Sequence, residues 1–290
     1  MTTGQIYNDF RNKLKTIYDD REAENICDWL FENVTGLKKW ERRQNQNSEF
    51  AETDSEKIKT YLEELLKHKP VQYVLHEAWF YKRKFYVNEN VLIPRPETEE
   101  LVEWIVSDFK KEKYSKPIKI IDIGTGSGCI PVSLKKELPE SSIAAIDVSD
   151  KALSVAKINA EELHAIINFF QIDFLNENEW KMLSQYDIIV SNPPYIPLNE
   201  KEILAKNVTD FEPGIALFVK NNDPFIFYKK IAGFTKSHLK ESGKIYVEVH
   251  EEYAKEVGSI FESAGFLVEI KNDIYGKQRM VKSTKSMAIL

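Results

Sequence analysis

Cysteine and patterned metal ligands are scarce in this chain of 290 residues. Only Cys27 and Cys129 are present, so a disulfide scaffold or a cysteine zinc site is excluded by number alone. The five histidines are scattered along the chain and show no ligand spacing. The sequence therefore predicts no metal site.

Long apolar runs are also missing. No run approaches the roughly 20 residues that span a bilayer. Residues 1–20 contain no apolar segment of the kind found in signal peptides, and Asp9, Asp19 and Asp20 argue against an organelle transit peptide. We therefore expect a cytoplasmic protein without a membrane partner.

An excess of positive charge is a third absence. Forty Lys and Arg residues stand against 46 Asp and Glu residues, which gives a net charge of −6 at pH 7. Duplex binding needs clustered Lys and Arg that release counterions, so this chain is a poor general binder of polyanions. We expect no direct nucleic-acid contact and a monomeric protein.

The first 70 residues have the apolar spacing of short helices. Five apolar residues follow the i, i+3, i+4, i+7, i+8 template: Ala23, Ile26, Cys27, Leu30 and Phe31. A similar run covers residues 58–66, and Thr53 with Glu56 predicts a capping box before it. No chemical group stands out, so residues 1–70 are predicted to form a small helical bundle.

Residues 71–97 differ from the helical segment in composition, and this composition predicts a β-hairpin or extended connector. Phe80–Phe85 and Tyr86–Ile93 are rich in aromatic and β-branched residues, as strands are. Pro94 and Pro96 force extended backbone, and Pro96 is suited to a helix start.

From residue 98 onward the pattern is that of an α/β domain, predicted to cover residues 98–290. Short apolar runs of strand length begin at Ile118, Ile143, Ile166 and Asp187, and helical patterns lie between them. Ser149 is a candidate cap for the helix that follows the second run. Apolar strands that alternate with amphipathic helices indicate a parallel sheet covered on both faces.

A glycine-rich loop follows the first of these strands. Its residues are Gly124, Thr125, Gly126, Ser127 and Gly128. This is the position at which open α/β sheets bind nucleotides, and the glycines allow close approach to a ligand. The spacing fits neither a dinucleotide fingerprint nor a Walker loop. The alternative is a glycine turn needed only for packing.

Acidic residues end the next two strands. Asp147 is suited to accept hydrogen bonds from both ribose hydroxyls of a nucleoside, or to cap the strand end. Asp173 could accept from an adenine amino group while Phe174 contacts the adenine face. The alternative there is a helix cap followed by a core phenylalanine.

The fourth strand runs into the tetrapeptide Asn192-Pro193-Pro194-Tyr195. Two prolines fix an extended backbone and remove two N–H donors. The Asn192 side-chain oxygen and the Pro193 carbonyl can then accept both hydrogens of one planar –NH2 group, against which Tyr195 can pack. The alternative, a rigid turn alone, does not explain its place after a nucleoside-binding sheet.

These motifs together resemble the HemK/PrmC family of peptide chain release factor glutamine N5-methyltransferases. The residues that carry the resemblance are Pro70–Tyr73, Val91–Glu99, Asp122–Ile130, Ser191–Ile196, Phe211–Pro213 and Ala216-Leu217. The resemblance covers the chain from about residue 70, and the helical first part agrees in length and type. There are departures at His76, Pro131, Val219–Pro224 and His250, outside the glycine loop and the tetrapeptide.

The resemblance implies a Rossmann-like class I methyltransferase domain with a seven-stranded, mostly parallel sheet. It implies S-adenosylmethionine as cofactor, S-adenosylhomocysteine as product and class I release factors as partners. The methylated atom would be the amide nitrogen of the glutamine in their Gly-Gly-Gln motif. The glycine loop, Asp147, Asp173, Phe174 and Asn192 would hold the cofactor. Asn192, Pro193, Pro194 and Tyr195 would hold the substrate. Residues 1–70 would recognise the protein substrate.

Two other functions use the same features. An N6-adenine nucleic-acid methyltransferase would use the tetrapeptide on an exocyclic amine, but the acidic composition and the absence of an evident target-reading domain weigh against it. A non-catalytic ligand-binding or scaffold protein would be indicated by a broken loop or tetrapeptide, and both are intact.

Overall fold

The computed structural model describes residues 1–112 and 117–285, which form two compact units. The N-terminal unit comprises Met1–Glu77 and Ala205–Phe211, and the sheet unit comprises the other described residues. The predicted boundaries at residues 70 and 97 stay a prediction. Residues 113–116 and 286–290 of the predicted α/β domain lie outside the described residues.

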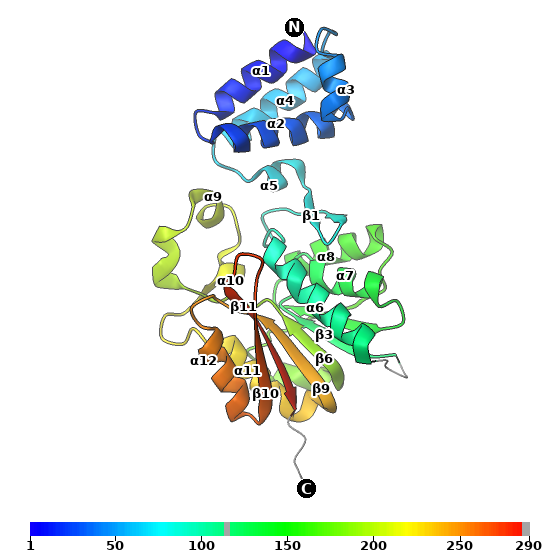
Figure 1. Ribbon diagram of the computed structural model, residues 1–290, viewed down its shortest axis with the longest axis vertical. Coiled ribbons are helices and arrows are strands. Elements are labelled where there is room, and N and C mark those ends of the chain that lie inside the picture. Colours follow the sequence, from blue (N-terminus) through cyan, green and yellow to red (C-terminus); the bar gives the residue numbers. More distant parts are fainter. Residues whose placement is uncertain (113–116, 286–290) are drawn as a thin grey trace. The chain divides into compact units, whose positions relative to one another are not determined.

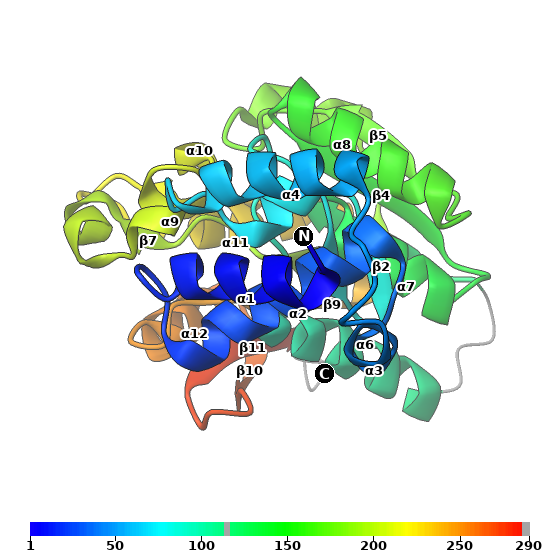
Figure 2. The same ribbon diagram turned by 90° about the horizontal axis from the view of Figure 1, so that it is seen from above.

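The N-terminal unit is helical. Its elements are α1 (Thr3–Leu14), α2 (Asp20–Thr35), α3 (Lys39–Gln44), α4 (Glu52–Leu65), α5 (Val71–Leu75) and α9 (Lys206–Thr209). Helices α1, α2 and α4 lie side by side (Figures 1 and 2) and completely bury Leu14, Leu30 and Leu65. The buried residues of α2 are the five apolar residues of the predicted helical pattern, so the helical bundle is confirmed.

The helix ends show where local sequence signals succeed and fail. Asp19 starts α2 by accepting a hydrogen bond from the Glu22 N–H. The predicted capping box at Thr53 is wrong, because α4 already begins at Glu52, whose negative charge favours the helix N-terminus. His76 follows the last residue of α5 and has a left-handed backbone, with a φ of 54°. This conformation favours glycine, the residue that the family resemblance led us to expect there.

The sheet unit begins with a hairpin of β1 (Ala78–Phe80) and β2 (Arg83–Phe85). Both turn residues have positive φ, as a type I′ turn requires. The predicted hairpin is present, but it lies within Ala78–Phe85, and Tyr86–Ile93 forms no strand. In this segment a side chain, and not a partner strand, accepts a backbone hydrogen bond. The Tyr86 N–H donates to Asn159 Oδ1 at 2.6 Å.

A seven-stranded sheet forms the centre of this unit (Figure 1). Its strands are β3 (Lys119–Ile123), β4 (Ser142–Asp147), β5 (Asn168–Gln171), β6 (Tyr186–Ser191), β9 (Leu239–Glu248), β10 (Phe266–Asn272) and β11 (Gln278–Lys285). The spatial order is β10-β11-β9-β6-β3-β4-β5, and only β11 runs antiparallel to its neighbours. The predicted seven-stranded, mostly parallel sheet is confirmed.

Helices cover both faces of the sheet. They are α6 (Pro96–Glu112), α7 (Cys129–Glu137), α8 (Asp150–Glu162), α11 (Ile226–His238) and α12 (Ala254–Ser263). Alternate strand residues divide between two cores: Ile121 and Ile189 pack with α11 and α12, whereas Ile120 and Ile188 pack with α6 and α7. Ser149 caps α8 as predicted, accepting from the Ala152 N–H.

Short elements fill the connections after β5 and β6. They are η1 (Glu177–Met182), β7 (Ile196–Pro197), η2 (Leu198–Ile203), α10 (Gly214–Leu217) and β8 (Phe218–Val219). Strand β7, which directly follows the tetrapeptide, pairs in parallel with β8. Among the described helices, none is both long and apolar enough to cross a membrane.

Candidate active site

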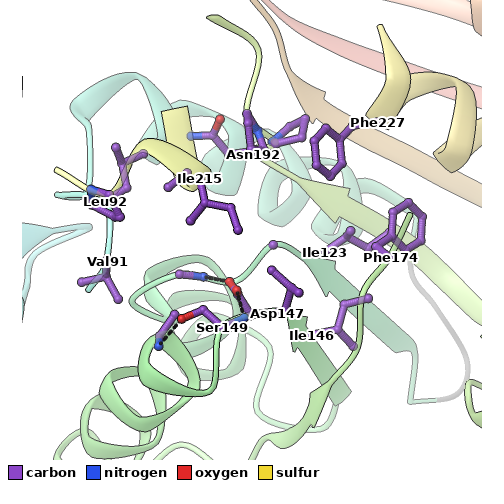
Figure 3. Close-up of a pocket in the computed structure, with 18 of the residues that line it drawn as sticks. Val91, Leu92, Ile123, Ile146, Asp147, Ser149, Phe174, Asn192, Ile215 and Phe227 are labelled. Atoms are coloured by element: carbon purple, nitrogen blue, oxygen red, sulfur yellow. Dashed lines mark hydrogen bonds between the residues drawn. The ribbon is translucent and has the colours of Figure 1, made fainter. Parts of the chain in front are cut away.

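A cavity of about 320 Å³ lies at the carboxyl ends of β3, β4 and β6 (Figure 3). Its lining residues are Asn90, Val91, Leu92, Ile123, Gly124, Gly126, Ile146, Asp147, Val148, Ser149, Ala152, Ile172, Asp173, Phe174, Leu175, Asn192, Pro193, Pro194, Pro213, Ile215, Ala216 and Phe227. In open parallel sheets this edge is where ligands bind. The cavity thus collects the predicted loop, acidic residues and tetrapeptide on one face.

Two glycines of the loop lie open to this cavity. Gly124 has φ +75° and Gly126 has φ +52°, and a Cβ added at either would meet no atom within 4 Å. The Gly124 and Thr125 N–H groups both donate to the Ile146 carbonyl, which anchors the loop to β4. The left-handed backbone and the free space together fit a loop that a ligand approaches closely.

The other loop residues have packing roles. Thr125 and Ser127 are buried and do not line the cavity. A Cβ at Gly128 would stand 3.0 Å from the Ala156 Cβ, so this glycine lets the loop approach α8. The packing alternative for the glycine loop therefore describes Gly128, whereas Gly124 and Gly126 face open space.

Asp147 joins the end of β4 to the glycine loop. Its Oδ2 accepts from the Gly126 N–H and its Oδ1 accepts from the Ser149 N–H, both at 2.9 Å. Burial raises the pKa of this carboxyl, while the bonds from Ser149 and Gly126 oppose that shift. The strand-end cap that was the alternative is thus present, and the same side chain also lines the cavity.

A second carboxyl, that of Asp122, is buried beneath the loop at the end of β3. The residue is 0% exposed, and neither carboxylate oxygen has a hydrogen-bond partner among the described residues. Burial raises its pKa to about 7; the nearby Thr125 side chain opposes this rise, and the charge of Asp147 adds to it. The motif contained this residue, but no ligand role was predicted for it.

The Asp122 carboxyl should make stability fall as pH rises. Its pKa is about 7 in the folded chain and near 3.9 when unfolded, so between these values the folded state holds the extra proton. Its stabilising effect is present at low pH and is lost as pH passes through about 7. Asp122→Asn should therefore gain stability relative to wild type more at pH 8 than at pH 5, measured by urea unfolding.

The control for Asp122→Asn is Asp150→Asn, which changes an exposed carboxylate on α8. Its stability difference from wild type should be similar at both pH values. If Asp122→Asn also showed the same difference at pH 5 and pH 8, the raised pKa would be refuted.

Asp173 and Phe174 follow β5 and line the cavity, where Phe174 lies at the end nearest to Phe227 (Figure 3). Asp173 is exposed, and its Oδ1 accepts from the Leu175 N–H at 3.0 Å, as a cap would. Phe174 is 5% exposed and stacks on Trp180 with ring centroids 5.3 Å apart. Both residues line the cavity. Asp173 also makes the capping contact, and Phe174 the core contact, that the alternative interpretation predicted.

The tetrapeptide begins at Asn192, which lies on the wall of the cavity across from Asp147 (Figure 3). Asn192, Pro193 and Pro194 line the cavity, whereas Tyr195 is not among its lining residues. The Tyr195 hydroxyl instead donates to Glu248 Oε1 at 3.1 Å. Packing of Tyr195 on a substrate amide stays a prediction.

A buried network holds the side chain of Asn192. Its Nδ2 donates to the Thr98 Oγ1 at 3.0 Å, and the Thr98 hydroxyl donates to Glu248 Oε2 at 2.6 Å. Thr98 is 3% exposed and Glu248 is 1% exposed. Burial raises the pKa of Glu248, and its bonds from Thr98 and Tyr195 counter that rise. No role was predicted from the sequence for Thr98 or Glu248.

Most of the remaining lining residues of the cavity are apolar. Val91 and Leu92 lie at one end, and Ile215 lies close to them (Figure 3). The first two come from the segment before α6, in which Glu212 anchors the backbone by accepting from the Ile93 N–H. These wall residues were not predicted, although Val91 and Leu92 fall within a quoted motif.

Comparison with known proteins agrees with this geometry. Residues 101–212 match the "Methyltransferase small domain" family, and residues 5–75 match the "PrmC N-terminal domain" family. A release factor glutamine methyltransferase from Flavobacterium psychrophilum is 43% identical over 94% of this chain and 95% of its own. Those of Bacteroides thetaiotaomicron and Lactococcus lactis are 35% and 37% identical, over 95% and 92% of this chain and 97% of each relative.

The sheet order, the open glycine loop and the matched domain make this chain an enzyme of the methyltransferase class. Its similarity to the curated relatives extends through both units and over nearly their whole length. The chain belongs to the release factor glutamine methyltransferase family, which confirms the resemblance drawn from the motifs.

Proposed function

We propose that this chain transfers the methyl group of S-adenosylmethionine to the side-chain amide nitrogen of the glutamine in the Gly-Gly-Gln motif of class I release factors. The observation that carries the proposal is the orientation of Asn192. Its Nδ2 is engaged by Thr98, so its Oδ1 is the amide atom left to accept from a substrate at the cavity wall.

The cavity fits the cofactor chemically. Gly124 and Gly126 offer open left-handed backbone, and Phe174 with the apolar walls suits an adenine ring. Asp147 lines the cavity at the end of β4, where its carboxylate can accept hydrogen bonds from the ribose hydroxyls of the cofactor. Thr125, Ser127, Gly128 and Asp173 shape the site around it. When bound, the cofactor supplies an electrophilic methyl group.

The protein's part is to orient the acceptor amide. An amide nitrogen is a poor nucleophile because its lone pair is delocalised into the carbonyl. Asn192 Oδ1 and the Pro193 carbonyl accept its two N–H hydrogens and hold the nitrogen in line. Such orientation can supply roughly 7–11 kcal/mol in favourable cases. No general base is needed in the transfer step, since the proton becomes acidic only as the C–N bond forms and then leaves to water.

A methyl-transfer assay with three acceptors tests this function. Intact release factor should be labelled from methyl-labelled cofactor, whereas a release factor with alanine at the Gly-Gly-Gln glutamine should not. Duplex DNA with exocyclic adenine amines should also stay unlabelled. Labelling of DNA alone would replace the proposal with the N6-adenine reaction. With a release factor as substrate, we propose that the enzyme acts as a monomer in the cytoplasm, where translation takes place.

We further propose that the N-terminal unit recognises the protein substrate. A cavity of about 190 Å³ on this unit is lined by Gly4, Tyr7, Asn8, Arg11, Glu24, Arg42, Arg43 and Gln46. Arg42 is occupied by Asp28, but Arg11 Nε is buried without a hydrogen-bond partner. No ion pair of Arg11 or Arg43 occurs among the described contacts, so both can receive an acidic group.

Reversing one of these charges should weaken recognition of the whole substrate. Arg43→Glu should raise the KM for intact release factor about tenfold, because a rim charge acts mainly on association. A short peptide around the glutamine should be methylated as by wild type. Arg21→Glu is the control, since Arg21 is exposed on α2 and does not line this cavity. Equal KM values for wild type and Arg43→Glu would remove this cavity from the recognition surface.

A further inference from the structure

The side-chain amide of Asn192 can face the substrate in two ways. Its oxygen and its NH2 group have nearly the same shape, so packing alone does not select between them. Only the orientation with Oδ1 toward the cavity lets Asn192 accept a hydrogen from the substrate. What selects that orientation must therefore be a hydrogen-bond partner with a fixed direction.

Thr98 is such a partner because its one hydroxyl hydrogen is already committed. It donates to Glu248 Oε2 at 2.6 Å, which leaves the Thr98 oxygen with lone pairs only. The amide atom that lies 3.0 Å from this oxygen must then be a donor, Nδ2. The carboxylate of Glu248, an acceptor, thus sets the direction of the whole chain of bonds.

We infer that Thr98 and Glu248 are positioning residues that fix the Asn192 amide with its oxygen toward the substrate. This inference rests on the proposed function of Asn192. Neither residue lines the cavity, and both are almost fully buried. A buried carboxylate is costly unless donors satisfy it, and Glu248 has one at each oxygen, Thr98 and Tyr195.

The same carboxylate therefore joins the two ends of the tetrapeptide. Tyr195 donates directly to Glu248 Oε1, and Asn192 is tied to Oε2 through Thr98. The Tyr228 hydroxyl donates to the Glu248 backbone carbonyl at 3.0 Å and holds the end of β9 in place. Glu248 thus links the rigid sheet to the segment that holds the acceptor amide.

Removing the Thr98 hydroxyl should release this constraint. Thr98→Val has nearly the same shape but can neither accept from Asn192 nor donate to Glu248. We expect kcat to fall about 10- to 100-fold, by analogy with the loss found when hydrogen-bond partners that orient metal ligands are removed. The cofactor Kd should stay within about twofold, and Thr98→Ser, which keeps the hydroxyl, should restore most of kcat.

A double-variant cycle separates positioning from general disruption. If Thr98 acts through Asn192, then Thr98→Val should cause no further loss of turnover in an Asn192→Ala background. If Thr98→Val merely disturbed the fold, its loss would multiply with that of Asn192→Ala, and the inference would be overturned. If Asn192→Ala were itself fully active, the proposed function of that residue would fail first.

Glu248→Gln gives a second test that does not depend on how Thr98→Val folds. Because the Tyr195 hydroxyl also donates to residue 248, the glutamine turns its oxygen toward Tyr195 and its NH2 toward Thr98. The Thr98 hydrogen is then free to donate to Asn192 Oδ1, which reverses the chain of bonds. Turnover on release factor should fall while cofactor binding by calorimetry and the melting temperature stay near wild type. Wild-type turnover in Glu248→Gln would contradict the inference.

Discussion

Asn192→Ala should lower the turnover of methyl transfer about 10²- to 10³-fold, the cost of removing one preorganised hydrogen-bond partner from such a site. The variant removes one of the two acceptors proposed for the substrate amide and frees that amide to rotate out of line. Cofactor affinity should change little, because Asn192 contributes at most a minor contact there. Single-turnover kinetics on release factor and calorimetry with the cofactor measure the two effects separately.

Two further variants sharpen the test of Asn192. Asn192→Asp keeps an acceptor for the substrate but cannot donate to Thr98, so it should retain more activity than the alanine variant and less than wild type. Asn199→Ala changes an exposed asparagine that does not line the cavity and should be fully active. Equal turnover of wild type and Asn192→Ala would contradict the proposed mechanism.

Asp147→Ala should weaken cofactor binding about 10- to 100-fold, equivalent to about 1.5–3 kcal/mol for a lost charge-assisted hydrogen bond. The structure adds a second reason for this effect. The carboxylate also accepts from the Gly126 N–H, so its removal loosens the loop that approaches the ligand. Calorimetry with the cofactor measures the change in affinity.

Asp147→Asn separates the two roles of this carboxylate. It retains an acceptor for one backbone N–H but loses the charge, so its affinity should lie between those of wild type and Asp147→Ala. Asp150→Ala, which removes an exposed carboxylate at the start of α8, is the matched control. Cofactor affinity unchanged in Asp147→Ala would remove that residue from the site.

Much of the fold could be predicted because its signals are local. The parallel strands are continuous apolar runs, and the Ser149 cap is read from one residue and its position. The segment Tyr86–Ile93 has the composition of a strand, so local patterns could not show that the hairpin ends before it. What replaces the partner strand is the Asn159 side chain, 73 residues away, which no local pattern reveals.

The site, too, has parts that local sequence motifs reveal and parts that only the folded chain brings together. The glycine loop and the tetrapeptide are contiguous, so their chemistry could be predicted from their residues. The partner of Asn192 lies 94 residues from it, and Thr98 and Glu248 lie 150 residues apart, so only the folded chain brings them together. Asp147 is intermediate: its place at the strand end was predicted, but its bond to Gly126 was not.

The most direct test of the central claim is tandem mass spectrometry of an intact class I release factor after incubation with this protein and methyl-labelled S-adenosylmethionine, with DNA in a parallel reaction. The proposed function predicts one labelled methyl group on the side-chain amide nitrogen of the Gly-Gly-Gln glutamine, and none on DNA. A methyl group on adenine, or an unmodified glutamine in a reaction where the protein binds the cofactor, would contradict it.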